Sequence, residues 1–548
     1  MKTVSLSFSS PLTLDEVQSI ALDAAEVTLA PDARERIALG RAVLTDALEK
    51  GTRVYGLNTG LGHTRDVEIS RDVLDQYQVD IVVSHAFGIG PSLPEPEVRA
   101  IMLARLAGAV RGYSGLSLPV AEFYSQMLNA GVVPNVPREG SIGASDLGTL
   151  AAIAATMIGR GTAFLNGTKL SSAQALQQAG LQPITLGLKE GLAVVSENSY
   201  SIGIGALALG EVARTLRLAD VAAALTMEAA RSSLTPFDPE VAVARSSRSQ
   251  ADVAANILSL LEGSYLTDPL QAISLQDPLS IRTVAQVHGA ARAVFDNLAF
   301  TVETELNASD DNPMTSPDTG RALSTGNFHP MEIALGFESI RVALAHLALI
   351  CERRVGVIGM EFWSSRASTD VASLPGGAIL TPGLGGYAHA AISARIRTLA
   401  NPVTLNIPSL DHGQEDHATA APLAVDFTRE LTAKLNDMLA GEIIIASALL
   451  SWRADVTLGA GTRPYFDVVV QAAKEGAADE LGGELVARAT PRLVEMTSRG
   501  VHLSRGADSA PDVHPSTGGA DLGSFAPTPL YRSRKKALTD ELHNAAAG

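Results

Sequence analysis

The stretch ALALGEVARTLRLADVAAALTMEAAR, residues 206–231, decides the fold class. Apolar side chains would cover most faces of a helix formed by this stretch, so the helix is expected to be buried on several sides. Similar helical runs fill residues 190–354. They are expected to be broken at Pro236, Pro269, Pro278 and Pro313. Because helices this apolar usually also pack against other subunits, the sequence predicts a mainly α protein that forms an oligomer.

Composition favours helices and narrows the class of partner. Of the 548 residues, 46% are hydrophobic and only 4% are aromatic, while the strong helix formers Ala and Leu are plentiful. The net charge of -17 argues against a nucleic-acid partner, because phosphate binding needs concentrated Lys and Arg. A single cysteine, Cys351, excludes both an internal disulfide and a cysteine metal cluster.

Neither a targeting segment nor a membrane span is expected. Residues 1–11 lack a basic region followed by an apolar run, which a signal peptide would need. No apolar stretch is both long enough and free enough of charge to cross a bilayer. The sequence therefore predicts a soluble, cytoplasmic protein with no membrane partner.

Three parts are expected along the chain. Residues 1–190 open with a predicted helix over Leu14–Val27 and carry two Gly-rich loops, so they are assigned to an N-terminal active-site domain. Residues 191–480 form a central domain of long bundled helices. Residues 481–548 form a C-terminal helical segment and a polar tail, whose basic run is typical of a solvated surface.

Taken one at a time, the candidate functional side chains have ordinary structural explanations. Tyr55 lies among glycines and fits a turn aromatic, and His85 fits a core histidine whose hydrogen bonds are satisfied. Arg282 fits a partner for a surface acid. Glu415, within the run Gln-Glu-Asp-His, fits a helix cap, and no second cluster at ligand spacing supports a metal site.

The order and wording of ten separated segments carry more information than any one residue. The segments are VYGLNTGLG (54–62), SHAFGIG (84–90), GYSG (112–115), PNVPREGSIGASDL (134–147), KEGLAV (189–194), QDPLSIRTVAQVHG (276–289), DDNP (310–313), GNFHP (326–330), LPGGAILTPGLGGY (374–387) and QEDH (414–417). Together they resemble the histidine and phenylalanine ammonia-lyases, and the resemblance covers most of the chain.

This resemblance implies a fold, an assembly and a reaction. The fold is the mainly α ammonia-lyase fold, with a long central helix bundle and Gly-rich loops that build the active site. The assembly is a homotetramer whose active sites combine several subunits. The reaction removes the amine from an α-amino acid and leaves a trans-α,β-unsaturated acid, of the urocanate type when the substrate is histidine.

The resemblance also assigns roles to individual residues. Tyr55 stands where the family has the base that removes the β-proton, and a phenol with a pKa of about 10 would need a pKa near 7 to ionise at neutral pH. Arg282 matches the guanidinium that grips the substrate carboxylate. Phe328 matches an apolar wall of the site, and Glu415 a polar group near the substrate. His85 resembles the histidine-specific branch, where it would hydrogen-bond an imidazole ring.

The sequence departs from the family at the residues that make its electrophile. The family cyclises an Ala-Ser-Gly tripeptide to methylidene-imidazolone (MIO), after the glycine nitrogen attacks the alanine carbonyl. Here the residues are Ala144, Ser145 and Asp146, and the attacking nitrogen would belong to a residue with a side chain, which disfavours the compressed backbone. Ser196 and Leu279 replace the family's Asn and Tyr beside the electrophile. Two expectations stay open: MIO from Ala144-Ser145-Asp146, or no cofactor.

Four functional hypotheses follow from this combination. The leading one is a carbon–nitrogen lyase acting on histidine or a close aromatic derivative. The first alternative is MIO-independent loss of trimethylamine from a histidine betaine such as ergothioneine; Glu197, Asp146 or Tyr200 would then face the cation, or serve as ordinary polar contacts. A 2,3-aminomutase would need MIO to hold the migrating amine. An inactive relative kept for binding is disfavoured by the retained base and carboxylate clamp.

Overall fold

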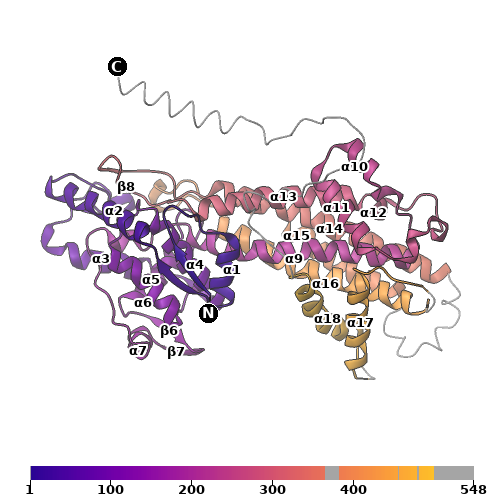
Figure 1. The fold of residues 1–548 in the computed structure, drawn as a ribbon. Helices are drawn as coiled ribbons and strands as arrows, with labels where there is room; N and C mark the ends of the chain where they lie inside the picture. The colour runs from indigo at the N-terminus through magenta and orange to yellow at the C-terminus, as the bar shows by residue number, and fades with distance from the viewer. Residues whose placement is uncertain (1, 365–381, 454–455, 478–479, 499–548) are drawn as a thin grey trace, which may run out of the picture. The chain divides into compact units, whose positions relative to one another are not determined.

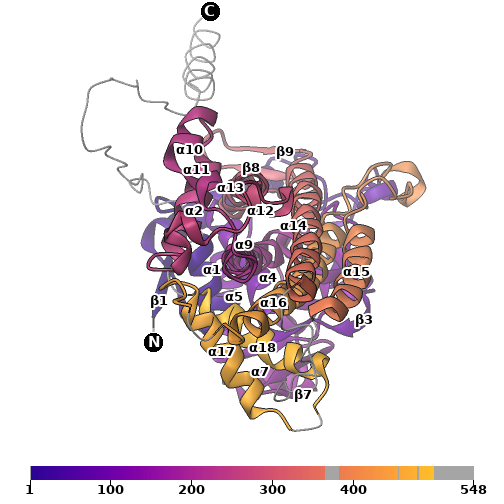
Figure 2. The same ribbon diagram turned by 90° about the vertical axis from the view of Figure 1, so that its right-hand side faces the viewer.

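The computed structural model describes residues 2–364, 382–453, 456–477 and 480–498, which pack as one compact unit. Five long helices form its centre: α9 (Ser199–Ala230), α13 (Val284–Leu306), α14 (Met331–Ser364), α15 (Pro382–Leu399) and α16 (Ala421–Ser451). They lie side by side in Figure 1 and Figure 2, and α9, α14 and α16 contact one another directly. The prediction of a mainly α fold built on a long helix bundle is confirmed.

Helix α9 is buried along nearly its whole length, as its apolar sequence predicts. Every residue from Ser199 to Gly210 is buried. Glycine lets a neighbouring helix come close, because a methyl group at Gly203 would lie 2.6 Å from the carbonyl carbon of Ala100 on α4 (Glu95–Val110). The helix ends at Arg231, whose φ of 56° is left-handed and cannot continue the helical path.

The four prolines that were expected to break the helices all lie outside the long helices. Pro236 and Pro269 lie in short 3-10 turns, Thr235–Phe237 and Pro269–Gln271. Pro278 immediately precedes α12 (Leu279–Arg282), and Pro313 immediately precedes a short strand. Proline lacks the backbone N–H that a helix interior needs, which explains these positions.

Shorter helices and small sheets surround the end of the bundle at which α9 begins. Besides α4, these helices are α1 (Leu14–Leu22), α2 (Pro31–Glu49), α3 (Leu74–His85), α5 (Leu118–Ala130), α6 (Leu147–Met157), α7 (Ser172–Gln178) and α8 (Glu190–Ala193). The predicted helix over Leu14–Val27 is too long, because α1 ends at Leu22. In the next residues, Val27 and Leu29 point inward in alternation, so Glu26–Leu29 becomes a strand.

The strands form four small sheets. Strand β1 (Thr3–Leu6) pairs in parallel with β2 (Glu26–Leu29), and the other pairings are antiparallel. The antiparallel sheets contain β3 (Ile89–Ser92) with β5 (Pro137–Glu139), β4 (Val132–Pro134) with β6 (Thr162–Leu165) and β7 (Thr168–Ser171), and β8 (Met314–Ser316) with β9 (Arg321–Leu323). These short pieces shape the loops at one end of the bundle.

Four further helices complete the described chain. Two follow α9, namely α10 (Pro239–Arg245) and α11 (Arg248–Leu260), and two follow α16, namely α17 (Arg463–Glu475) and α18 (Gly482–Met496). Helices α17 and α18 pack on each other and on α16. The division of the chain into three domains stays a prediction.

Helix α14 corrects one expectation. Its residues Met331–Phe362 contain an 18-residue window with a mean hydropathy of 1.7, which makes the helix long and apolar enough to cross a membrane, so the prediction that no stretch has this length and composition is wrong. Half of that apolar window is buried inside the chain, where α14 packs against α13, α15 and α16. Buried core helices have the same composition as membrane spans, which is why length and hydropathy alone do not separate them.

The contact between α9 and α4 predicts a sharp effect of one methyl group. Gly203→Ala should lower the free energy of unfolding by about 1–3 kcal/mol, because the new methyl group meets backbone that cannot rotate away. Gly483→Ala in α18 is the matched control, since no atom lies within 4 Å of its new methyl group. Urea unfolding at one fixed protein concentration measures both variants. Equal effects of the two substitutions would contradict this account of the α9–α4 contact.

Candidate active site

Tyr55 is held by the Gly-rich turn in which the sequence placed it. Its phenolic oxygen accepts a hydrogen bond of 2.9 Å from the backbone N–H of Gly62. Gly62 has a φ of 53°, in the left-handed region that glycine adopts at little cost. The tyrosine is partly buried against the core. An N–H aimed at the phenolic oxygen favours the phenolate, so the turn is suited to support a base.

Glu415 and His85 lie in the same electrostatic neighbourhood as Tyr55. Burial raises the pKa of Tyr55, the Gly62 N–H lowers it, and the charge of Glu415 raises it again. Burial and the Asp411 carboxylate raise the pKa of Glu415, whereas His85 lowers it. The structure therefore brings together three of the predicted site residues, which lie on segments far apart in sequence.

The direction of the Tyr55 shift differs from what a base at neutral pH requires. A base at neutral pH needs a tyrosine pKa well below the ordinary value, whereas the surroundings of Tyr55 in one chain raise its pKa. Among the described residues, the Glu415 and Asp411 carboxylates raise the pKa of Tyr55 and Arg65 lowers it. Ionisation at neutral pH would need more positive charge than these residues place beside the phenol.

The His85 ring is fixed by its own helix. Its Nδ1 lies 2.7 Å from the carbonyl oxygen of Ile81, one turn earlier on α3, and therefore carries the proton when the ring is neutral. The other ring nitrogen, Nε2, is then a hydrogen-bond acceptor. This tautomer suits a partner that donates an N–H, as an imidazole ring can.

Ala144, Ser145 and Asp146 form a buried segment that touches Phe328 and Ser196. The Ser145 N–H donates to the carbonyl oxygen of Phe328 at 3.1 Å, and the Ser145 hydroxyl lies 3.3 Å from the Ser196 hydroxyl. Ser145 has a φ of 55°, which is costly for a residue with a side chain. Ser145, the middle residue of the segment, is therefore strained and is held by its contacts with Phe328 and Ser196.

Asp146 anchors this segment to the start of α9. Its carboxylate accepts hydrogen bonds from the backbone N–H groups of Tyr200 and Ser201, at 2.9 and 3.1 Å, and from the Ser141 hydroxyl at 2.5 Å. Its own N–H donates to the carbonyl oxygen of Glu197 at 2.8 Å. The side chain is fully buried, and burial raises its pKa to about 6 against the opposing hydrogen bonds. Both the nitrogen and the carboxylate of Asp146 are therefore engaged.

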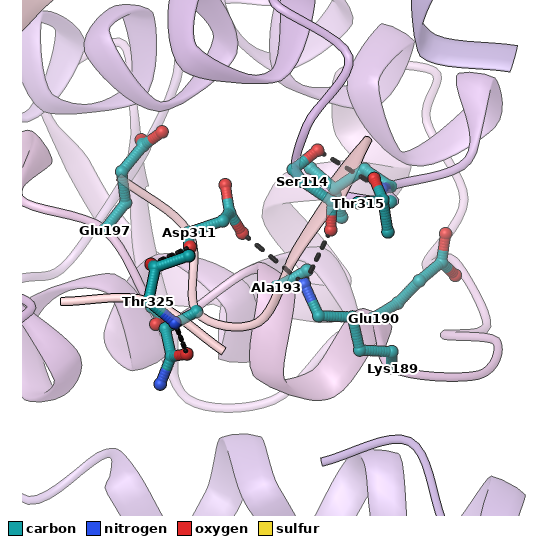
Figure 3. A network of polar contacts seen from close by, with 12 residues as sticks. Ser114, Lys189, Glu190, Ala193, Glu197, Asp311, Thr315 and Thr325 are labelled. Carbon is teal, nitrogen blue, oxygen red and sulfur yellow. Dashed lines mark hydrogen bonds and ion pairs between the residues drawn. The ribbon is translucent and has the colours of Figure 1, made fainter. Parts of the chain in front are cut away.

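A buried ionic layer lies behind this segment. Glu197 pairs with Arg105 at 2.9 Å, and Lys189 lies 3.7 Å from Asp311 and donates to the Ser114 carbonyl at 2.7 Å. Figure 3 shows Asp311 between Glu197 and Lys189. Burial is the main cause that raises the pKa of Glu197 to about 7 and lowers that of Lys189 to about 8. These groups brace the polypeptide that carries Ser196.

The three side chains considered as partners for a cationic substrate have internal partners instead. Asp146 binds the start of α9, Glu197 binds Arg105, and the Tyr200 hydroxyl donates to Asp426 at 2.9 Å. All three residues are buried. Their explanation as structural contacts is therefore the better one.

Arg282 is far from Tyr55 within the chain. It is the last residue of α12, which lies at the opposite end of the bundle from α3 and α2 in Figure 1. Its Nε is buried without a hydrogen-bond partner among the described residues. Leu279, at the start of α12, is mostly exposed. The chain thus separates the predicted carboxylate clamp from the predicted base.

Sequence reasoning missed two histidine contacts near the site. His63 binds Asp411 through its ring, at 2.8 Å, and the rings of His329 and His417 approach at 2.9 Å between Nε2 and Nδ1. Each pair joins residues that are far apart in sequence, so no spacing pattern could reveal it. Among the described residues, no group of three or more His, Cys, Asp or Glu side chains could hold a metal ion.

Comparison with known proteins adds an independent finding. The family description "Aromatic amino acid lyase" matches residues 12–471. A histidine ammonia-lyase of Anaeromyxobacter sp. (strain K) is 38% identical over 465 residues, which are 81% of this chain and 89% of that protein.

Two solved structures show how widely this fold is shared. The ergothioneine-degrading ergothionase of Treponema denticola has a TM-score of 0.84 and 28% identity, over 91% of this chain and 100% of that one. The phenylalanine aminomutase of Pantoea agglomerans has the same TM-score, with 26% identity over 91% of this chain and 100% of that one. The fold is therefore shared by an ergothioneine-degrading enzyme and an aminomutase.

Proposed function

Because this chain belongs to the aromatic amino acid lyase family and is a carbon–nitrogen lyase of the ammonia-lyase type, we propose that it removes the amine from histidine or a close aromatic derivative. The product is a trans-α,β-unsaturated acid of the urocanate type. The observation that carries the proposal is the grouping of Tyr55, Glu415 and His85 around a phenol supported by the Gly62 N–H. The similarity to histidine ammonia-lyases supports the substrate class.

The reaction assigns one task to each of these side chains. The Tyr55 phenolate takes the β-proton, the electrons of the broken C–H bond form the double bond, and the positively charged α-nitrogen group leaves as a neutral amine with the electrons of the C–N bond. Arg282 binds the substrate carboxylate, and Phe328 provides an apolar wall. His85, protonated on Nδ1, accepts from an imidazole N–H, and Glu415 contacts the polar end of the substrate.

Tyr55→Phe tests the assignment of the base. The variant should lose at least about 10²-fold in kcat, because it cannot accept the β-proton. The ultraviolet absorbance of the unsaturated acid measures turnover of histidine and of its Nα-trimethyl betaine. Tyr465→Phe, on the remote helix α17, is the control and should retain wild-type turnover. Unchanged turnover in Tyr55→Phe would remove Tyr55 as the base.

The residues at the tripeptide position do not fit MIO. Ring closure would need the Asp146 nitrogen to attack the Ala144 carbonyl, but that nitrogen donates to Glu197. It would also pull the Asp146 carboxylate away from the N–H groups of Tyr200 and Ser201 at the start of α9. The proposed site therefore works without this electrophile.

A site without the electrophile favours a second candidate substrate. Ammonia is a poor leaving group, whereas a trimethylammonium nitrogen is permanently cationic and leaves as neutral trimethylamine. A histidine betaine of the ergothioneine kind meets this requirement. The similarity to an ergothionase supports this candidate, as does the engaged nitrogen of Asp146.

Intact mass and two substrates separate these candidates. The purified chain should have the mass of its unmodified sequence, because MIO formation would remove two water molecules. The betaine should then turn over faster than histidine, with trimethylamine and the unsaturated acid formed in equal amounts. A mass deficit of two waters together with faster turnover of histidine would overturn the MIO-independent proposal and restore ordinary ammonia-lyase chemistry.

The 2,3-aminomutase and the inactive relative are the weaker alternatives. An aminomutase would return a β-amino acid and would need MIO to hold the migrating amine. An inactive relative would have no chemical use for the grouping of Tyr55, Glu415 and His85. Chromatography of the products identifies both cases, since neither gives an unsaturated acid as the main product.

We propose a cytoplasmic homotetramer as the working form, and the separation of Arg282 from Tyr55 supports sites that are shared between copies. When one copy of the chain packs antiparallel to another, the α12 end of one copy can approach the Tyr55 end of the next. The exposed Leu279 and the unpartnered Nε of Arg282 then gain neighbours from another copy. Each active site would contain residues of several subunits.

Subunit complementation tests this arrangement. Tyr55→Phe and Arg282→Met homo-oligomers should each lose at least about 10²-fold in kcat/KM, and co-expressed mixed oligomers should recover a substantial fraction of wild-type activity. Recovery follows because some sites combine an intact Tyr55 of one copy with an intact Arg282 of another. The control mixes the two proteins after purification without subunit exchange. No recovery in co-expressed oligomers would mean that both residues come from one chain.

A further inference from the structure

Asp411 ties together two turns that are 348 residues apart in sequence. One of its oxygens, Oδ2, accepts a hydrogen bond of 3.0 Å from the backbone N–H of His63, and Oδ1 lies 2.8 Å from Nδ1 of the His63 ring. The neutral ring donates here in the tautomer that carries its proton on Nδ1. A single carboxylate therefore holds both the backbone and the side chain of His63.

Gly62 links this contact to the base. A methyl group at Gly62 would lie 2.2 Å from Oδ2 of Asp411, so only glycine lets the carboxylate approach so closely. The N–H of the same Gly62 donates to the phenolic oxygen of Tyr55. The residue that supports the base and the residue that Asp411 holds are thus adjacent in the chain.

Asp411 also shares a tight turn with Glu415. Leu410 and Glu415 close this turn with backbone hydrogen bonds of 2.8 and 3.3 Å. Within it, Asp411 and His412 have φ values of 45° and 55°, which residues with side chains rarely adopt. Such a backbone persists only where its surroundings hold it. The hydrogen bonds to His63 supply that restraint. Glu415 belongs to the same turn, so its position depends on them.

We infer that Asp411 is a positioning residue that fixes the Tyr55 base and Glu415 relative to each other, acting through His63. This inference rests on the proposed role of Tyr55 as the base. A displacement of about 1 Å between reacting groups can cost on the order of 10²-fold in rate, so one carboxylate that locks two turns has a large effect without touching the substrate.

The charge of Asp411 and its hydrogen bonds have opposite effects on Tyr55 as a base. Among the described residues, the titratable and charged groups around the phenol are Glu415, Asp411, Arg65, Tyr77, His85 and the Asp411-bound His63. Among them, the Asp411 carboxylate raises the pKa of Tyr55 and also that of Glu415. Asp411 thus aids the base by geometry and opposes its ionisation by charge. Substitution can separate these two effects.

The test compares two substitutions of Asp411 in the full-length protein. Asp411→Asn keeps the size of the side chain and an acceptor for the His63 N–H, but it removes the charge. Asp411→Ala removes the charge and the acceptors together. Asp66→Asn is the matched control, because the Asp66 side chain is 86% exposed in the same region of the chain. Thermal unfolding of each variant shows whether it is folded.

Two readouts are expected to diverge between the variants. Asp411→Ala should lower kcat by roughly 10²-fold, whereas Asp411→Asn should retain most of kcat at its own pH optimum. The midpoint of Tyr55 ionisation, followed by NMR with tyrosine labelled by ¹³C at Cζ and assigned by its loss in Tyr55→Phe, should fall by at least about 0.5 pH unit in Asp411→Asn. Asp66→Asn should change neither value.

The outcomes also separate this inference from the proposed function. The NMR titration needs no turnover, so it is readable even when neither substrate reacts. An unchanged Tyr55 midpoint in folded Asp411→Asn overturns the coupling of Asp411 to the base, as do equal losses of kcat in the Asn and Ala variants. Full activity of Tyr55→Phe overturns the proposed base, whatever the titration shows. A lowered midpoint with loss of kcat only in Asp411→Ala supports the inference.

Discussion

The bond between the Asp146 carboxylate and the start of α9 is the contact on which fold and site both depend. The first N–H groups of a helix have no partner within the helix, and those of a buried helix cannot turn to water. Asp146 accepts the N–H groups of Tyr200 and Ser201 and also precedes α6. The side chain thus fixes the start of α9, and the residue itself lies between the strained Ser145 and the start of α6.

The hydrogen bonds of Asp146 also affect whether the electrophile can form. The resemblance to the ammonia-lyases places the electrophile-forming tripeptide at Ala144–Asp146 and makes the Asp146 nitrogen the attacking atom. Here that nitrogen donates to Glu197, and Glu197 in turn belongs to the ionic layer with Arg105. The acceptor is the backbone carbonyl oxygen of Glu197, while the Glu197 side chain pairs separately with Arg105. The segment is therefore held by a backbone hydrogen bond and by the carboxylate bonds of Asp146 to α9.

The electrostatics of Tyr55 fit the proposed site, in which another copy of the chain completes the surroundings of the phenol. Tyr55 lies among carboxylates, and the guanidinium predicted to bind the substrate lies at the other end of the bundle. A cationic substrate held by Arg282 of another copy would supply the missing positive charge. Assembly and substrate binding would then bring the phenol closer to ionisation. In that arrangement Tyr55 would be a poor base until the substrate is bound.

The sequence by itself determined the class of fold and named candidate side chains for the site. The apolar run of α9 predicted a buried helix, because a helix without a polar face has to be covered on all sides. The prolines predicted breaks, since proline cannot donate within a helix. The resemblance identified Tyr55, His85 and Glu415, whose proximity the structure supports. Local rules failed at Glu26–Leu29, where pairing with β1 overrode a helical pattern.

Only the tertiary structure decided how these residues work together. No spacing in the sequence relates His63 to Asp411, or Asp146 to Tyr200, because such contacts depend on how distant segments are folded against each other. Burial, which raises the pKa of both Asp146 and Glu197, also exists only in the folded chain. The separation of Arg282 from Tyr55 follows from the length of the bundle helices. The sequence named the chemical groups, and the packing of the chain assigned them their partners.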